Sequence, residues 1–266
     1  MEGALENWLA VIIDFHAHPG FGRDLQRLRA EFRDALRAAD HHQVDWICLN
    51  AIADWTPSPS AAEVRKGNDI ILSLMAEHPQ RVIGFCYVNP NDADESMQEI
   101  ERCVVEGGMA GIKLWQACKA SDRRVDPIAQ RAAELGVPIL QHAWYNVLGN
   151  GETESTPADV AQMAARHPRT RIVMAHLTGA GERGLADIAP FENVCVDISG
   201  GEPEAGMVEM AVARLGAERV VFGTDTPIRS YGATLGKVLE ARLNAGQRAL
   251  ILGGNARRLL GRRLGG

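Results

Sequence analysis

The sequence predicts a parallel α/β fold, a (β/α)8 barrel, and three observations lead to this prediction. Short apolar runs rich in β-branched residues recur about eight times along the chain. Stretches with helical spacing of apolar residues separate these runs, which is typical of parallel strands joined by helices. The first run leads into FHAHPGF and not into a glycine-rich phosphate loop, so a closed barrel is favoured over a doubly wound sheet.

The expected elements follow in order from the N-terminus. Residues 11–15 (VIIDF) read as the first strand, and Leu25, Leu28 and Phe32 lie at helical spacing within a predicted helix over 24–39. The other strands are expected at 44–49, 82–88, 110–115, 137–142, 172–176, 194–198 and 220–223. The other helices are expected at 61–76, 92–105, 126–135, 158–166 and 203–215, with closing helices to the end of the chain.

Length and composition fit one barrel domain over residues 1–266. The net charge of −6 comes from interspersed charges, so neither nucleic acid nor an anionic membrane is expected as a partner. No apolar run approaches the roughly 20 residues that span a bilayer. The start, MEGALENWLAVIIDF, lacks the basic segment of a secretory leader, and the five cysteines form no C-x-x-C pair. A soluble, cytoplasmic protein with buried free thiols is therefore expected.

Two histidines follow the first predicted strand in the sequence DFHAH. Side chains alternate along a strand, so His16 and His18 should lie on the same side of the sheet. In a barrel, that position is the carboxyl end of the strands, where active sites form. Two imidazoles placed in this way can bind one metal ion, although an H-x-H pattern alone has little specificity.

Three further polar residues end apolar strands. His142 closes VPILQH, His176 closes RIVMAH and Asp225 follows VVFG in VVFGTD. A single histidine of this kind is usually a buried residue satisfied by backbone groups. The topology of a barrel, however, brings all of these strand ends to one mouth, so the set predicts a metal site.

The motifs DFHAH, GIKLW, QHAWY, MAHLTG, FGTDTP and NARRLLG resemble the amidohydrolase superfamily over almost the whole chain. The branch they resemble includes aminocarboxymuconate-semialdehyde decarboxylase, small lactonases and aromatic-acid decarboxylases. The resemblance implies that His16, His18, His142 and Asp225 bind a single divalent ion. It also implies that His176 acts as a general acid/base. On chemical grounds, Asp225 can also accept a proton from a metal-activated water. Zinc is the expected metal, with manganese, iron or cobalt as alternatives.

Lys113, in GIKLW at the end of the fourth predicted strand, has three candidate roles. In two-metal relatives a carbamylated lysine bridges the ions. In the single-metal branch, the amine could instead bind an anionic substrate or form a structural ion pair. A lysine at this position also argues against a TatD-type nuclease, which requires a glutamate there.

Five residues are expected to line the substrate pocket because each follows a predicted strand end: Trp55, Trp115, Trp144, Tyr145 and Arg229. The tryptophans either bind substrate or cap the barrel as packing residues. Arg229 either pairs with a substrate carboxylate or is solvated.

The first functional hypothesis is hydrolysis of a lactone, ester or amide of a small organic acid by a metal-activated water. The alternative is non-oxidative decarboxylation, or hydration, of an unsaturated or aromatic acid at the same site. A non-catalytic, metal-binding barrel is disfavoured because none of the five expected site residues is missing. The loops after strands one and seven look brief, which predicts either an open pocket or one completed by a second copy in a homodimer.

Overall fold

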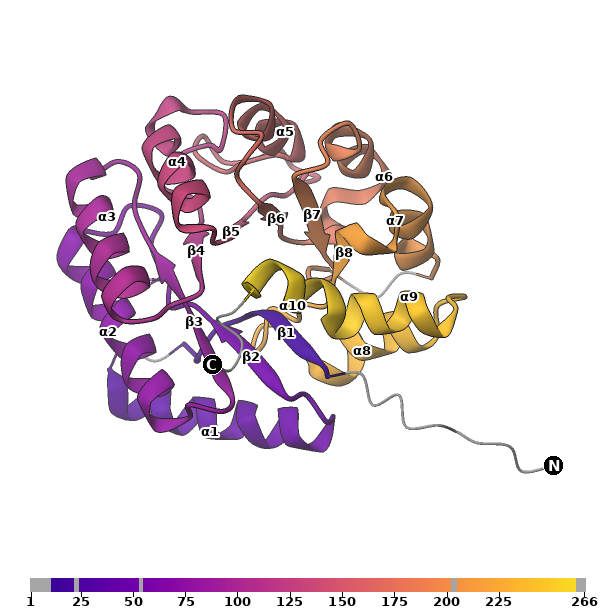
Figure 1. The fold of residues 1–266 in the computed structure, drawn as a ribbon, viewed down its shortest axis with the longest axis horizontal. Helices are drawn as coiled ribbons and strands as arrows, with labels where there is room; N and C mark the ends of the chain where they lie inside the picture. The colour runs from indigo at the N-terminus through magenta and orange to yellow at the C-terminus, as the bar shows by residue number, and fades with distance from the viewer. Residues whose placement is uncertain (1–10, 22–23, 53–54, 202–204, 262–266) are drawn as a thin grey trace.

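The computed structural model describes residues 11–21, 24–52, 55–201 and 205–261. Its centre is one parallel sheet in which every strand pairs with the next along the chain (Figure 1). This architecture confirms the predicted barrel. The strands are β1 (Ile13–Ala17), β2 (Trp46–Leu49), β3 (Val82–Tyr87), β4 (Gly111–Leu114), β5 (Ile139–Gln141), β6 (Ile172–Met174), β7 (Val194–Asp197) and β8 (Val220–Val221).

The sheet closes between β1 and the segment that follows β8. A parallel bridge joins Ala17 to Thr226. The amide of His18 donates to the carbonyl of Thr226 at 2.7 Å, and the amide of Asp225 donates to the carbonyl of His16 at 2.6 Å. The backbone of the predicted metal-binding residues therefore closes the barrel at its mouth.

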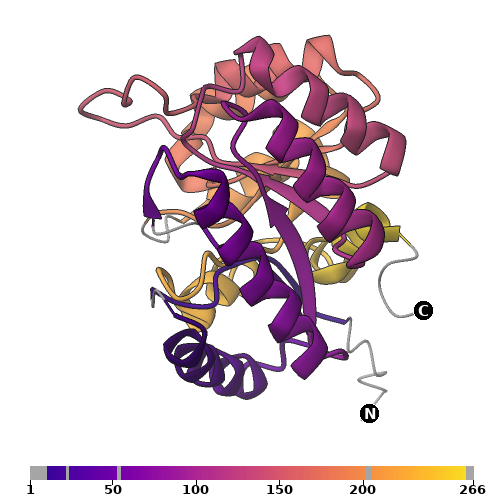
Figure 2. The ribbon, with the colours of Figure 1, turned by 90° about the vertical axis from the view of Figure 1, so that its left-hand side faces the viewer.

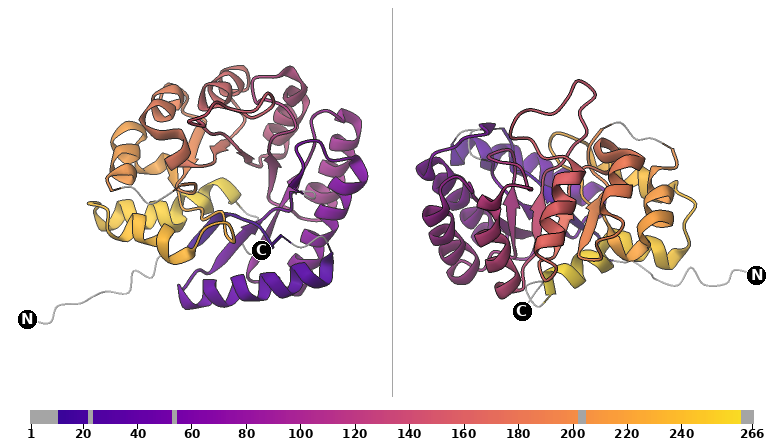
Figure 3. Two further views of the ribbon diagram at one scale, coloured as in Figure 1. Left: turned by 180° about the vertical axis from the view of Figure 1, so that it is seen from behind. Right: turned by 90° about the horizontal axis from the view of Figure 1, so that it is seen from above.

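Helices form the outer layer around this sheet (Figure 1; Figure 3). They are α1 (Leu25–His41), α2 (Ala61–Glu77), α3 (Ala93–Ile100), α4 (Asp126–Leu135), α5 (Pro157–Arg166), α6 (Leu177–Ile188), α7 (Met207–Leu215), α8 (Tyr231–Leu239), α9 (Ala245–Ala249) and α10 (Asn255–Leu260). Two π-helical segments, Glu101–Glu106 and Leu250–Gly254, continue α3 and α9. Short 3-10 turns occupy Arg123–Val125 and Ala217–Arg219. None of the described helices is long and apolar enough to cross a membrane.

Helix α6 is an element that the sequence pattern does not predict. Its sequence, LTGAGERGLADI, contains three glycines, which weaken the helical pattern. Gly181 has φ 63° and marks a kink. At Gly179 a Cβ would lie 2.4 Å from Cδ2 of Trp144, so only glycine leaves room for that indole. Close packing against the loop after β5 explains why glycine is used here.

Two apolar layers hold the barrel together. Side chains of the helices pack against the outer face of the sheet. Phe15 and Phe85 lie in the interior with their rings edge to face, 5.1 Å apart. Leu259 and Leu260 of α10 belong to this interior cluster, and Val11, just before β1, packs against it. Helix α10 therefore covers the amino end of the barrel and leaves the carboxyl ends of the strands for the site. The cysteines are all buried and free, as expected.

The longest connection at the carboxyl end follows β5. Residues 143–156 project beyond the ring of helices, and this segment stands clear of the barrel in two views (Figure 2; Figure 3, right). Val147 and Leu148 at its tip are almost fully exposed, whereas Ser155 at its base is buried. The Ser155 hydroxyl accepts a bond from the amide of Ala120 at 3.0 Å and one from the side chain of Gln141 at 3.3 Å. The base of this loop is therefore anchored to the barrel.

Candidate active site

Polar side chains that are at most 8% exposed gather at the carboxyl end of the barrel. They come from five different strands or from the residues directly after them, so the barrel itself positions them. Because buried polar groups need partners, their contacts define the site. The group consists of His16 on β1, Lys113 on β4, His142 after β5, His176 after β6 and Asp225 after β8.

His16, His18 and Asp225 form a cluster whose ligand atoms lie within 4.8 Å of one another. Nε2 of His18 is 3.1 Å from Oδ1 of Asp225, and Nε2 of His16 is 3.5 Å from the same oxygen. Two imidazole nitrogens and a carboxylate oxygen are ligands that zinc and manganese accept. This donor set fits the divalent ion expected from the sequence.

The outer nitrogens of these two imidazoles are held by acceptors. Nδ1 of His16 lies 2.8 Å from Oδ2 of Asp197, and Nδ1 of His18 lies 3.0 Å from the backbone carbonyl of Asn50. A carboxylate or carbonyl can only accept, so each Nδ1 carries the proton. Each Nε2 is then the unprotonated nitrogen that a metal ligand needs, and both Nε2 atoms lie within 3.5 Å of Asp225.

His142 and His176 form a second pair beside this cluster. Nδ1 of His142 lies 3.1 Å from Nε2 of His176, and Nδ1 of His176 lies 2.9 Å from the Ser199 hydroxyl. Asp197 links the two groups, because its Oδ1 accepts from the backbone amide of His176 at 3.0 Å. Among the described residues, a second group that could hold a metal ion consists of His16, His176 and Asp197. His142 belongs to neither of the two groups. Its place as a fourth ligand stays a prediction.

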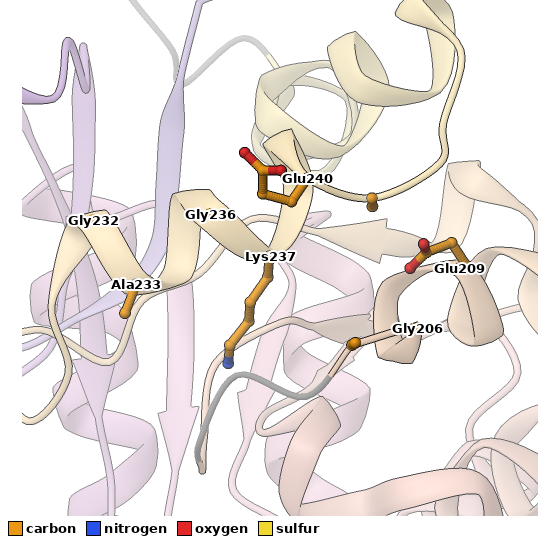
Figure 4. A pocket seen from close by; sticks show the side chains of 9 residues that line it. Gly206, Glu209, Gly232, Ala233, Gly236, Lys237 and Glu240 are labelled. Carbon is orange, nitrogen blue, oxygen red and sulfur yellow. The ribbon is translucent and has the colours of Figure 1, made fainter.

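The segment after β7 is held from outside by α8. A cavity of about 330 Å³ separates α7 from α8, and Lys237 crosses it (Figure 4). The Lys237 ammonium donates to the carbonyls of Ile198 at 3.0 Å and Gly200 at 3.3 Å. These bonds flank Ser199, so Lys237 supports the hydroxyl that contacts His176.

Burial and charge set the protonation of the site. Burial lowers the pKa of His16, His142 and His176, which favours neutral imidazoles. Burial alone would raise the pKa of Asp225, but its interactions with the imidazoles of His16 and His18 hold that pKa well below its ordinary value. Asp225 is therefore an anion, as a metal ligand must be.

Lys113 borders the metal cluster. Its Nζ lies 3.1 Å from Nε2 of His16, where the ammonium donates to the imidazole lone pair. Burial lowers the pKa of Lys113 to about 8, against the charges of Asp225 and Asp197, which raise it. An amine so placed is close to any anion bound at the cluster.

Each of three site histidines has a tryptophan edge-to-face beside it. Ring centroids are 4.9 Å apart for Trp55 and His18, 6.4 Å for Trp115 and His142, and 5.2 Å for Trp144 and His176. The structure therefore places the three predicted tryptophans around the imidazoles.

Tyr145 and Arg229 are placed away from this group. The Tyr145 hydroxyl donates to Asp187 on α6, and Arg183 stacks over the phenol ring at 4.2 Å. Arg229 is half-buried and lines a cavity of about 440 Å³ beside α1. The described lining of that cavity contains none of the site histidines. Neither side chain has a described contact with the cluster.

Four residues of the site are absent from the sequence-based prediction. Asp197 ends the apolar run VCVD and Asn50 ends ICLN, so both carry the strand-end pattern that identified the histidines. Ser199 lies two residues after Asp197. Glu154, whose Oε1 lies 3.2 Å from Nε2 of His142, comes from the loop after β5 and has no local signal in the sequence.

The chain is similar to known proteins of one family. A family model described as Amidohydrolase matches residues 13–262. A 2-amino-3-carboxymuconate-6-semialdehyde decarboxylase of Dictyostelium discoideum is 24% identical over 73% of this chain and 65% of that protein, just under two thirds of its length. A gamma-resorcylate decarboxylase of Rhodococcus jostii is 24% identical over 85% of this chain and 88% of its own length.

A solved structure shares the fold. The dihydroxybenzoic acid decarboxylase from Polaromonas sp. JS666, crystallised with manganese and the inhibitor 2-nitroresorcinol, aligns with a TM-score of 0.73 and 19% identity, over 95% of this chain and 97% of that one. Because the family model covers nearly all of the sequence and the barrel matches as well, this chain belongs to the amidohydrolase family.

Proposed function

We propose that this enzyme is a metal-dependent decarboxylase of a small aromatic or unsaturated carboxylic acid. The observation that carries the proposal is the set of tryptophans beside the site imidazoles, because flat apolar walls suit a planar substrate. Both curated relatives described above are decarboxylases, and so is the solved neighbour. The first hypothesis, hydrolysis of a lactone, ester or amide, has no support from these comparisons.

His16, His18 and Asp225 would hold the metal, with His142 as the fourth proposed ligand. When bound, the ion would supply positive charge to the anionic substrate and to the electron pair released from it. Manganese is the ion in the neighbouring structure, and the histidine-rich ligand set also suits zinc. Either ion is consistent with the proposal.

Decarboxylation requires that a proton replace carbon dioxide. The bond between the carboxylate carbon and the substrate breaks, its electron pair stays on the substrate carbon, and that carbon takes up a proton. We assign proton delivery to His176. Burial keeps this imidazole neutral in the free enzyme, and a substrate anion beside it would raise its pKa, so that the imidazolium forms only in the complex.

The other side chains would orient the acid. The ammonium of Lys113 is a candidate partner for the carboxylate or a neighbouring phenolate. Trp55, Trp115 and Trp144 would hold the ring and exclude water from the carbon that receives the proton. Tyr145 and Arg229 have no role in the proposal, because their described contacts lie elsewhere.

A paired screen tests the reaction. Protein reconstituted with manganese is given dihydroxybenzoates and carboxylated muconate derivatives in one series, and lactones in the other. We expect carbon dioxide from at least one aromatic or unsaturated acid, and one deuterium on the product carbon when the solvent is D₂O. Acid release from a lactone, with no carbon dioxide from any acid, would restore the hydrolytic hypothesis.

A further inference from the structure

The outer nitrogen of His142 faces a carboxylate that neither the sequence pattern nor the family assignment identifies. Nε2 of His142 lies 3.2 Å from Oε1 of Glu154, in the loop after β5. The Gln116 side chain donates to the same Oε1 at 3.1 Å. Nε2 of His142 and Nε2 of Gln116 are 3.5 Å apart, as expected for two donors that share one acceptor.

The contact repeats a pattern found at the other two histidine ligands. Nδ1 of His16 is held by the carboxylate of Asp197, and Nδ1 of His18 by the carbonyl of Asn50, while the second ring nitrogen of each faces the interior. His142 follows the same rule with its nitrogens exchanged, because here Nε2 is the outer atom and Nδ1 faces His176 at 3.1 Å. In metalloenzymes, outer acceptors of this kind fix the tautomer of a histidine ligand.

Glu154 is held in position by its surroundings. Its side chain is 14% exposed, and its other oxygen accepts from the amide of Gly151 at 3.3 Å. The neighbouring Ser155 anchors the loop to the barrel. The hydrogen bond from His142 lowers the pKa of Glu154, which keeps the carboxylate ionised and able only to accept. Such an anchored acceptor can select one tautomer of His142.

We propose that Glu154 is a positioning residue that holds His142 in the tautomer protonated at Nε2, so that the Nδ1 lone pair is available to the metal. The proposal rests on the metal site described under the proposed function, but not on the reaction catalysed there. It also makes the loop of residues 143–156 part of the metal site, because this loop carries Glu154 as well as Trp144.

The first test needs no metal. Long-range ¹H–¹⁵N correlation spectra of the protein labelled at histidine report which ring nitrogen of each imidazole bears the proton. In the metal-free protein we expect His142 to be protonated at Nε2, and His16 and His18 at Nδ1. In Glu154→Ala, His142 should become a mixture of tautomers while the other two stay unchanged. His142 protonated at Nδ1 in the unsubstituted protein would overturn the proposal.

The second test measures metal binding. Cobalt(II) is titrated into the metal-free protein, and its visible spectrum and its competition with a chelator are followed. Glu154→Ala should bind cobalt roughly 10- to 100-fold more weakly, with an altered spectrum, and Glu154→Gln should lie between it and the unsubstituted protein. Glu152→Ala is the matched control, because this exposed residue of the same loop should leave both readouts unchanged.

The outcomes separate the two levels of the account. Equal affinity and identical spectra for both Glu154 variants would overturn the positioning role and leave the metal site standing. Failure of the unsubstituted protein to bind cobalt would overturn the metal site itself, and with it the role of Glu154. Circular dichroism of each variant shows whether the fold is retained, and Glu154→Gln, which preserves the volume of the side chain, still tests the proposal if the alanine variant does not fold.

Discussion

Lys113 places a cation inside a barrel that could have been filled with apolar side chains. Its side chain is 1% exposed and its amine contacts His16. Burial lowers its pKa to about 8, so the charged form is less stable in the folded protein than in the unfolded chain. A buried cation that costs stability is better explained by function than by folding.

This cost predicts how stability depends on pH. The folded pKa of about 8 lies below the unfolded value of 10.5, so the charged amine destabilises the folded protein fully below pH 8, and this cost disappears as pH rises toward 10.5. Metal-free protein should therefore gain stability from pH 8 to pH 10 relative to Lys113→Met, by about 2 kcal/mol. Urea unfolding of both proteins at several pH values measures the difference.

Two results check that reasoning. At pH 7 the methionine variant should be the more stable protein, while its carbon dioxide release should fall. Parallel stability curves for the two proteins across this pH range would show that the amine is not destabilised by burial.

At the residue scale, the sequence predicts the side chains that would bind the metal better than the residues that form hydrogen bonds with them. The histidines and Asp225 stand at the ends of apolar strands, so topology alone brings them together. Asp197 shows the same pattern at the end of β7 but is absent from the predicted site. Glu154 could not be predicted, because its contact with His142 depends on the path of a loop, and no periodicity specifies that path.

Among the elements, α6 and the loop after β5 act as one unit. Trp144 lies against His176, with a ring-centroid distance of 5.2 Å, and packs on Gly179 of α6. The amide of Tyr145 also donates to the carbonyl of Gly179 at 2.9 Å. The glycines that obscure this helix in the sequence are thus explained by the indole that they accommodate.

Replacement of Gly179 by alanine should displace Trp144. The added Cβ would lie 2.4 Å from Cδ2 of the indole, so we expect a loss of about 1–3 kcal/mol in the free energy of unfolding and weaker binding of a dihydroxybenzoate, measured by tryptophan fluorescence. Gly236→Ala in α8 is the control, because no atom lies within 4 Å of its added Cβ. That variant should be slightly more stable than the parent and bind equally well. Equal free energies of unfolding and equal binding for the two variants would contradict the packing argument.

The strands were the most predictable elements, since each is a short apolar run between helices of ordinary spacing. Helix α3 was predicted to continue to residue 105, but it changes to a π-helical turn at Glu101–Glu106. Hydrogen-bond register of this kind depends on packing against neighbours and leaves no mark on apolar spacing.

For the whole molecule, the backbone contacts that close the barrel are made by residues of the site. The strand ends β1 and β8 meet through backbone bonds of His16, His18 and Asp225, so the residues that would bind the metal also join the first strand to the last. A metal bound there should therefore stabilise the closed barrel as a whole. Whether a second copy of the chain completes the pocket stays a prediction.

The most direct test of the central claim is the rate of carbon dioxide release during a metal titration. Protein stripped of metal receives manganese in steps, with a carboxyl-labelled dihydroxybenzoate or another acid found in the screen as substrate. The account predicts no release without metal, a rise that ends at one ion per chain, and no activity in His16→Ala. Release that is independent of metal would contradict the account, and a rise that continues to two ions per chain would instead favour a bridging role for Lys113.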